Sequence, residues 1–231
     1  MNRKALFSIP DIPVAAGMTS QEYAYKRLRN AIMLGAIEPG TSLTMRGLAE
    51  CLDLSPTPIR EAIRRLTSEY AIQIKDNRRM MVPLMTIERF EELVALRIKV
   101  EAHAAKRALP YISDLIIEKM TEMDNKMDDV ISEKDLNQLT LINQAFHRTL
   151  YTVNPSQASM PIIESIWLQL GPFQRQVVKR VNEDYKVDRH KEILAALTTR
   201  DANLLQEAIT NDISDGVLTS GRNLFALMGI A

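Results

Sequence analysis

The sequence predicts a mainly α-helical protein with an N-terminal winged helix-turn-helix, whose wing is a small β-hairpin, and a C-terminal all-α helical bundle. Helical segments, a tight turn and two short alternating runs follow one another before residue 86, and only helical periodicity follows it. The charge divides at the same place, because residues 1–85 hold 12 Lys+Arg and 8 Asp+Glu, whereas residues 86–231 hold 17 and 21. The basic first part suggests nucleic acid as its partner, although an imbalance of this size also arises by chance.

The composition excludes several classes of protein. Of the 231 residues, 46% are hydrophobic and 25% are charged, which is ordinary for a soluble globular chain. No apolar run approaches the roughly 18 residues that cross a bilayer, and the N-terminus lacks a signal peptide, so we expect a cytoplasmic protein without membrane contact. The lone Cys51 excludes an internal disulfide. Glycine-rich phosphate loops and the GxSxG, HExxH and CxxC motifs are absent, so we do not expect an enzyme.

The first part of the chain has the elements of a winged helix-turn-helix in order. Apolar spacing predicts three helices, over residues 23–34, 45–52 and 57–69. A tight turn at 53–55 separates the second helix from the third, and Pro58 lies in the first turn of the third, where its missing N–H costs nothing. Ile72 and Ile74 then alternate with polar residues, and a second apolar run follows at 81–84. An Asp76-Asn77 turn between these two runs predicts a β-hairpin.

The remainder of the chain shows no convincing strand. Prolines at 110 and 155 and the Arg200-Asp201 pair mark breaks between helical segments. The spacing predicts six helices, over residues 86–108, 112–131, 135–152, 157–181, 184–199 and 201–227. We therefore expect an all-α bundle, joined to the first domain by a short connection near residues 83–86.

The third helix has one apolar and one basic face. At 100° per residue, one side carries Ile59, Ala62, Ile63 and Leu66, and the other carries Thr57, Arg60, Glu61 and Arg64. The apolar side can pack on the first two helices, so that the basic side enters a major groove. Arg46 opens the preceding helix and can reach the adjacent DNA backbone, and Arg78 and Arg79 lie at the hairpin tip. Arg65 lies at the edge of the basic cluster, where a solvated surface position is the better interpretation.

These residues also carry a resemblance. The strings RGLAE at 46–50 and TPIREAIRRL at 57–66, with Asn77-Arg78-Arg79 beyond them, are similar to the GntR family of bacterial transcription regulators. The segment GAIEPG at 35–40 resembles that family's turn between its first helix and first short strand. With the analysis of the faces, the resemblance implies DNA contacts by Arg46, Ser55, Thr57, Arg60, Arg64, Arg78 and Arg79. Two departures from the family pattern, Pro56 for Arg and Arg79 for Gly, imply an operator that differs from the common one.

The helical remainder resembles the FCD ligand-binding domain of the FadR-like branch of that family. LRIKVE at 96–101, NQAFHRTL at 143–150 and RHKEI at 189–193 carry the resemblance. In many such domains an Asp and three His hold a divalent metal, and the matching positions here are Asn143, His147, His190 and Asp212. Asn143 replaces a carboxylate and Asp212 replaces a His. The resemblance therefore implies a weaker site for Zn or Ni, and one acceptable to harder ions such as Mn or Mg.

The resemblance also implies an effector, which in this family is often a small organic acid. Arg97 and Arg148 are the candidates for binding its carboxylate, because a guanidinium pairs with a carboxylate through two parallel hydrogen bonds. A salt bridge within the protein is the alternative for both. His147 and His190 have an alternative too, because they can hydrogen-bond an effector directly without a metal.

Three parts of the chain are expected: a flexible arm over residues 1–19, a DNA-binding domain over 20–85, and an effector-binding and dimerisation domain over 86–231. We expect a homodimer whose two recognition helices bind a double-stranded, pseudo-palindromic operator, with the effector shifting the dimer between arrangements. Two alternatives stay open. The helical domain can serve dimerisation alone, without an effector, or His147 and Asp212 can support metal-dependent hydrolysis.

Overall fold

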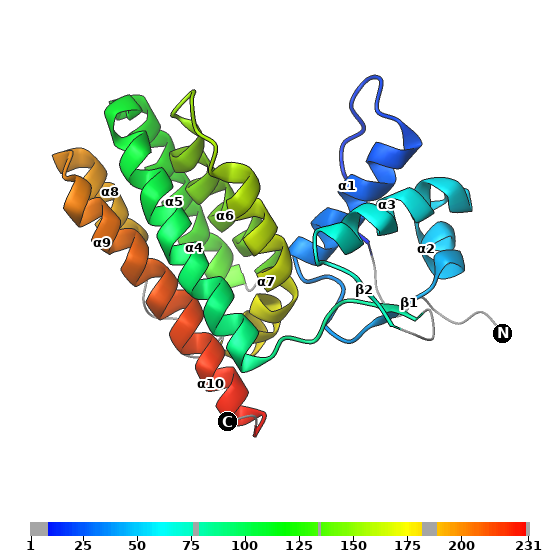
Figure 1. Ribbon diagram of the computed structural model, residues 1–231. Coiled ribbons are helices and arrows are strands. Elements are labelled where there is room, and N and C mark those ends of the chain that lie inside the picture. The colour runs from blue at the N-terminus through cyan, green and yellow to red at the C-terminus, as the bar shows by residue number, and fades with distance from the viewer. Residues whose placement is uncertain (1–8, 76–78, 134, 182–188, 230–231) are drawn as a thin grey trace. The chain divides into compact units, whose positions relative to one another are not determined.

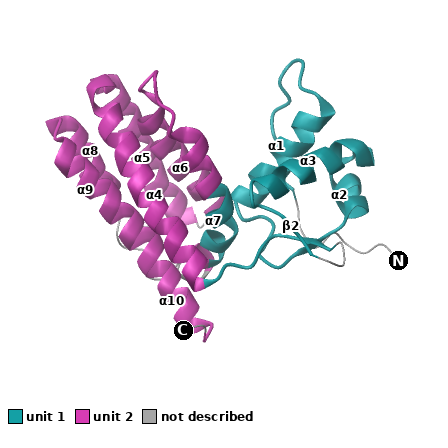
Figure 2. Ribbon diagram, in the orientation of Figure 1, with its two compact units in different colours: residues 1–86, 167–176 teal, residues 87–166, 177–231 magenta. Residues whose placement is uncertain are grey.

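The computed structural model describes residues 9–75, 79–133, 135–181 and 189–229 (Figure 1). Two compact units are present (Figure 2). One contains Met1–Thr86 with Trp167–Gln176, and the other contains Ile87–Ile166 with Val177–Ala231. The described chain is mainly helical with one small antiparallel sheet, so the predicted fold class is confirmed.

The first unit is built on three helices: α1 (Ser20–Met33), α2 (Met45–Leu52) and α3 (Pro56–Ser68). A capping box starts α1, because the Thr19 hydroxyl accepts from the Glu22 N–H and the Glu22 carboxylate accepts from the Thr19 N–H. Thr44 caps α2 through the Gly47 N–H, at 3.0 Å. Both α1 and α2 pack on α3. Their shared core includes the fully buried Leu28, Ile32, Leu48, Ile59 and Leu66.

A three-stranded antiparallel sheet completes this unit, in the order β1 (Ser42–Leu43), β3 (Met80–Met81), β2 (Gln73–Ile74). The hairpin predicted after α3 is confirmed as β2 and β3, with Ile74 opposite Met80. Periodicity did not predict β1, because two residues are too short to show an alternation. The turn residue Arg78 lies outside the described residues.

The segment before α1 is anchored from Ile9 onward, which differs from the expectation of a loose arm over all of residues 1–19. The Arg27 guanidinium donates to the carbonyl oxygens of Ile9 at 2.7 Å and Pro10 at 3.2 Å, and it pairs with Asp11 at 2.8 Å. Arg27 is buried, and Ile9 is only 7% exposed. A buried guanidinium needs several acceptors, and this segment supplies three of them.

The second unit is an all-α bundle, as the sequence predicts. Its elements are α4 (Ile87–Ala108), a 3₁₀ turn η1 (Leu109–Tyr111), α5 (Asp114–Glu133), α6 (Leu136–Thr152), the ends of α7 (Met160–Val181), α8 (His190–Thr199), α9 (Ala202–Ile213), a π-helical segment η2 (Ser214–Thr219) and α10 (Ser220–Leu227). The helix predicted over 201–227 is therefore interrupted by η2. The predicted start of another helix at 184 lies outside the described residues. Within the described ranges, no helix is both long and apolar enough to span a bilayer.

The bundle places α5, α6, α8 and α9 together, with α4 against both α6 and α9. Asp135 caps α6 by accepting from the N–H groups of Asn137 and Gln138. Asp201 caps α9 in the same way, through Asn203 and Leu204. These caps mark where α6 and α9 begin, and packing on the neighbouring helices decides which of their side chains face inward.

Tyr70 ends α3 in the left-handed region, at φ 59°, and its side chain is 66% exposed. A left-handed backbone costs a β-carbon residue roughly 1–2 kcal/mol, whereas glycine adopts it freely. We expect Tyr70→Gly to stabilise the chain by about 0.5–1 kcal/mol after the greater unfolded-state entropy of glycine is subtracted. Urea unfolding of the full chain measures this. Asp53→Gly, at φ 51°, is the matched control, and it should gain less because aspartate tolerates this conformation; equal gains would contradict the argument.

Candidate DNA-binding surface and candidate metal centre

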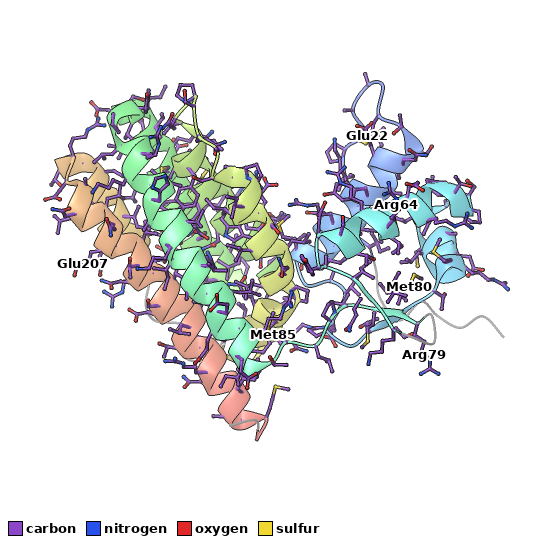
Figure 3. The ribbon with its side chains drawn as sticks, in the orientation of Figure 1. Glu22, Arg64, Arg79, Met80, Met85 and Glu207 are labelled. Carbon is purple, nitrogen blue, oxygen red and sulfur yellow. The ribbon has the colours of Figure 1, made fainter. Side chains whose placement is uncertain are left out.

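Helix α3 divides its side chains between the core and the solvent. Ile59, Ala62, Ile63 and Leu66 are buried against the rest of the first unit. Thr57, Arg60 and Arg64 are exposed on the other side, and Figure 3 shows Arg64 directed outward from α3. This is the arrangement that periodicity predicts, and it leaves a basic helix face free to enter a major groove.

The start of α3 leaves one backbone donor. Ser55 is the N-cap residue, and Pro56 and Pro58 occupy the first and third helical positions. Neither proline has an N–H, so Thr57 supplies the only backbone donor of the first three positions, with its hydroxyl beside it. Ser55 and Thr57 are both exposed. This helix end therefore presents the Thr57 N–H and two exposed hydroxyl groups, which are groups that can hydrogen-bond a phosphate.

The predicted arginines lie on this surface as far as the structure describes them. Arg46 pairs with Glu50 at 2.7 Å, and Arg64 pairs with Glu61 at 3.0 Å; both guanidinium groups are largely exposed, at 89% and 78%. Such surface pairs contribute little, so a phosphate can replace the carboxylate at small cost. Arg79 is exposed beside β3. An open groove of about 620 Å³ runs between α2 and the start of α3, lined in part by Arg46, Ser55 and Pro56.

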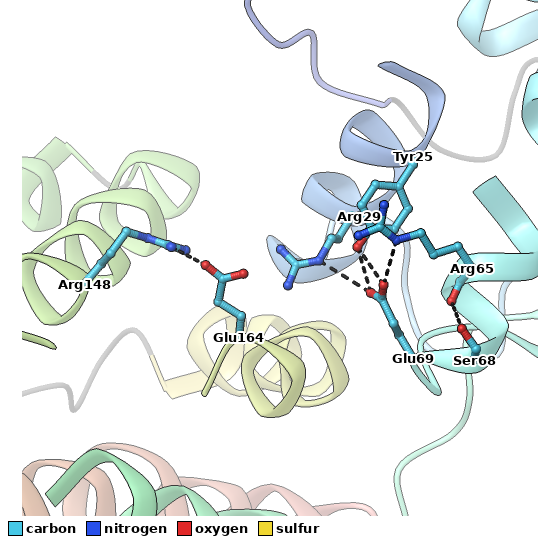
Figure 4. A network of polar contacts seen from close by, with 7 residues as sticks. All are labelled: Tyr25, Arg29, Arg65, Ser68, Glu69, Arg148 and Glu164. Carbon is cyan, nitrogen blue, oxygen red and sulfur yellow. Dashed lines mark hydrogen bonds and ion pairs between the residues drawn. The ribbon is translucent and has the colours of Figure 1, made fainter. Parts of the chain in front are cut away.

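Arg65 has a different environment from the other arginines of α3. Its guanidinium lies 3.6 Å from the centre of the Tyr25 ring and 3.2 Å from Glu69 (Figure 4). Glu69 also accepts from the Tyr25 hydroxyl at 2.7 Å and lies 3.6 Å from Arg29. Burial and the hydrogen bond to Glu69 raise the pKa of Tyr25 to about 12. Arg65 thus joins α1 to the end of α3, a contact that its interpretation as a solvated surface position did not include, although 59% of its side chain is exposed.

Three of the four predicted metal ligands meet inside the bundle. His147 on α6, His190 on α8 and Asp212 on α9 each offer a ligand atom, and these atoms all lie within 4.8 Å of one another. The distance from His147 Nε2 to Asp212 Oδ2 is 3.3 Å, and that from His190 Nε2 to Asp212 Oδ1 is 3.8 Å. Both imidazoles are buried, whereas the Asp212 side chain keeps 15% of its surface.

Asn143 is the fourth predicted ligand, one helical turn before His147. Its Nδ2 lies 3.2 Å from Nε2 of His190. A half-turn of the side-chain amide would exchange Nδ2 and Oδ1, and Oδ1 is the amide atom that can bind a cation. Phe146 covers the apolar side, with its ring centre 4.4 Å from that of His190. The arrangement therefore offers two imidazole nitrogens, a carboxylate and an amide, behind a hydrophobic wall.

The charges around this cluster favour an ionised Asp212. Burial alone raises the pKa of its carboxyl, but contact with the His147 ring and the positive charge that His147, His190 and Arg97 can carry outweigh burial. The net shift of the Asp212 pKa is downward. When the two imidazoles are neutral, their nitrogens and the ionised carboxylate form a donor set that a divalent cation can use.

The two predicted effector-binding arginines have partners in the protein. Arg97 is buried, and its Nε lies 2.6 Å from Oε1 of Glu101. Burial lowers the pKa of Arg97, but the Glu101 carboxylate raises it by more, so this guanidinium stays charged. Arg148 is 41% exposed and donates to Glu164 on α7 (Figure 4). Of the two, Arg97 is the one that Asp212 influences electrostatically.

Sequence reasoning missed three residues around the cluster. Asp124 on α5 is buried, with Oδ1 3.2 Å from Nδ1 of His190. The Tyr151 hydroxyl lies 3.2 Å from Nδ1 of His147 and donates to Glu101 at 2.8 Å. The sequence could have indicated that Asp124 is buried, because it lies four residues after Met120 and three before Met127. This spacing places it on the apolar face of its helix. Tyr151 follows His147 by four residues, which places both on one face of α6.

Comparisons with known proteins agree with this description. The family described as "Bacterial regulatory proteins, gntR family" matches residues 20–82, and the FCD domain matches residues 92–215. The HTH-type transcriptional regulator McbR of Escherichia coli K12 is 26% identical over 181 residues, covering 75% of this chain and 80% of McbR. The gluconate operon transcriptional repressor of Bacillus licheniformis is 27% identical over 199 residues, covering 81% and 79%.

A solved structure shows the same fold. E. coli McbR/YncC matches with a TM-score of 0.81 at 21% identity, over 90% of this chain and 99% of that chain. Families and relatives alike are transcription regulators, so metal-dependent hydrolysis is set aside. The FCD domain alone spans more than half of the 231 residues, and the basic face of α3 lies within the gntR match. The chain therefore belongs to the GntR family of bacterial regulatory proteins, with a C-terminal FCD domain, and it is a DNA-binding transcription regulator.

Proposed function

We propose that this regulator is a homodimer whose operator affinity is controlled by a small carboxylate effector, bound through a divalent metal at His147, His190, Asp212 and Asn143. The observation that carries the proposal is the meeting of two buried imidazoles and an ionised carboxylate inside the helical unit. On the DNA side, the proposal assigns operator contacts to the Arg46, Ser55, Thr57, Arg60, Arg64, Arg78 and Arg79 positions.

The residues present fit a divalent ion. Two ligands about 2.1 Å from a tetrahedral ion are about 3.4 Å apart, and the His147 and Asp212 atoms are separated by 3.3 Å. Nε2 of His147 is fully buried and makes no hydrogen bond among the described residues. An orphaned buried nitrogen is costly, and a cation between it and Asp212 would remove that cost.

A carboxylate is the effector class that such a centre favours. Two neutral imidazoles and one carboxylate around a divalent ion leave a net positive charge in the first coordination sphere. With these four ligands, harder ions such as Mn or Mg would keep open positions, as they prefer six oxygen or nitrogen ligands. The metal would supply an electrophilic anchor for the effector's oxygen atoms. The positive charge of Arg97 would act on Asp212 and add to the positive potential at the site.

We expect the protein to repress transcription, and we expect the effector to weaken or strengthen this repression. Relatives of this chain include the gluconate operon repressor of B. licheniformis and the repressor RspR of E. coli, and we extend that sign of regulation to it. Two recognition helices in a dimer must match the half-site spacing of the operator. An effector that binds one dimer arrangement more tightly shifts the population toward that arrangement.

The test uses an operator obtained by selection from random duplex DNA with the purified chain. We expect a carboxylate from a panel of small organic acids to change the dissociation constant at least fivefold in metal-loaded protein, but not in chelator-treated protein. Fluorescence anisotropy of labelled operator measures both states. Protein that binds its operator but takes up none of Zn, Ni, Mn or Mg would contradict the metal-borne effector and would favour a DNA-binding dimer without one.

A further inference from the structure

A buried chain of polar groups ends at Nδ1 of His147, the ring nitrogen that does not face Asp212. Arg97 pairs with Oε1 of Glu101 at 2.6 Å, and Oε2 of the same carboxylate accepts from the Tyr151 hydroxyl at 2.8 Å. The Tyr151 oxygen lies 3.2 Å from Nδ1 of His147. Glu101 and Tyr151 have no exposed surface, and His147 keeps only 1%. Water is therefore excluded from these contacts, so their donors and acceptors must match one another.

The direction of each hydrogen bond follows from the number of protons available. Tyr151 has one hydroxyl proton, and the carboxylate of Glu101, paired with Arg97, can only accept it. The Tyr151 hydroxyl directs this proton to Oε2 of Glu101, at 2.8 Å. The Tyr151 oxygen then has only lone pairs to offer His147. Nδ1 of His147 must therefore carry a proton and donate it to Tyr151.

The other nitrogen of the ring follows from this assignment. A neutral imidazole with its proton on Nδ1 has a lone pair on Nε2. That lone pair lies 3.3 Å from the Asp212 carboxylate, so two acceptors face each other. This pairing is unfavourable unless a metal ion or a second ring proton lies between the two atoms. Among the described residues, Nε2 has no well-oriented hydrogen-bond partner.

We propose that Tyr151, held by Glu101 and Arg97, is a positioning residue that fixes His147 in the Nδ1–H tautomer and so keeps the Nε2 lone pair ready for a metal. This inference rests on the proposed metal site and adds to it the residue that prepares one ligand in advance. Outer groups of this kind fix the tautomer and the orientation of a ligating ring. His190 has a different outer partner, because Asp124 lies beside its Nδ1. The two imidazoles therefore depend on separate residues, and a change at Tyr151 should affect only one of them.

The variant Tyr151→Phe tests this, because it removes one oxygen atom and keeps the ring. We expect its affinity for Zn, measured in competition with a chromophoric chelator, to fall roughly tenfold. In metal-free protein at pH 8, ¹⁵N NMR of the imidazoles should show the His147 proton on Nδ1 in the parent and shared between both nitrogens in the variant. The His190 ring proton should stay on its original nitrogen, and the backbone amide spectrum reports that the bundle remains folded. Tyr111→Phe, at a half-exposed tyrosine in η1, is the matched control and should change neither quantity.

The outcomes separate the two proposals. A variant with unchanged Zn affinity and an unchanged His147 tautomer overturns the role of Tyr151, while metal uptake by the parent still supports the proposed function. A parent that binds no metal overturns the metal-borne effector, but the positioning of His147 stands if Tyr151→Phe alters its tautomer. A parent with its proton on Nε2 overturns the inference directly.

Discussion

Replacing Arg60 by alanine should weaken binding to the selected operator roughly 10- to 100-fold, equivalent to about 1–3 kcal/mol, with no loss of fold. Arg60 is exposed on α3, between Thr57 and Arg64 on the face opposite the buried Ile59 and Ile63. An arginine at this position can donate two parallel hydrogen bonds to a guanine edge, and alanine can donate none. Anisotropy titrations at fixed salt measure the effect, and urea unfolding confirms that the fold is intact.

Arg65→Ala is the matched control, because it removes the same charge from the same helix. Arg65 contacts Tyr25 and Glu69, so its loss should cost up to about 1 kcal/mol of stability while leaving the choice of base sequence unchanged. Both variants remove one positive charge and so weaken the general attraction to phosphate equally. A larger loss in Arg60→Ala than in Arg65→Ala therefore measures base recognition by Arg60. Equal losses in the two variants, on specific and random DNA alike, would remove Arg60 from the recognition surface.

The second large effect is expected at the metal centre. The double variant His147→Ala with His190→Ala removes both imidazoles and should lower metal affinity by more than the roughly 100-fold that loss of an outer-sphere partner causes. Elemental analysis of purified protein should find metal in the parent and only traces in the variant. Titration with Zn in the presence of a competing chelator measures the residual affinity.

The third histidine of the chain provides the control for this experiment. His103 lies exposed on α4, so His103→Ala changes the histidine content without touching the cluster, and its metal content should equal that of the parent. Both buried histidines leave cavities when truncated, and stability must be measured in parallel. A parent without metal, or a folded double variant that retains it, would favour the alternative in which His147 and His190 contact an effector directly.

The fold was predictable from sequence where apolar periodicity is long. The three helices of the first unit and the helices of the bundle each present a stripe of several turns, and TPIREAIRRL fixed the family as well. Two short features were not predictable from periodicity. Strand β1 lies outside any alternating run and was implied only by the resemblance of residues 35–40, and η2 is a six-residue π-helical segment within an otherwise α-helical region.

The candidate centre was predictable only in part. Asn143 and His147 share a helical turn, but His190 and Asp212 join them only through the packing of α8 and α9, which the family resemblance supplied. Of the outer residues, Asp124 and Tyr151 are indicated by helical spacing, but Glu101 is not, since it approaches Tyr151 from 50 residues away. Their roles depend on hydrogen-bond distances, and spacing within one helix cannot give these.

The prolines at positions 56 and 58 have a consequence for the thermodynamics of operator docking. Their rings fix two backbone dihedrals at the start of α3, so this turn is already ordered before DNA arrives. Little conformational entropy then remains to be lost locally when the helix docks. Calorimetry should accordingly show a heat-capacity change of operator binding that the apolar surface buried in the interface accounts for. A protein segment that folds as it binds would make this heat-capacity change more negative.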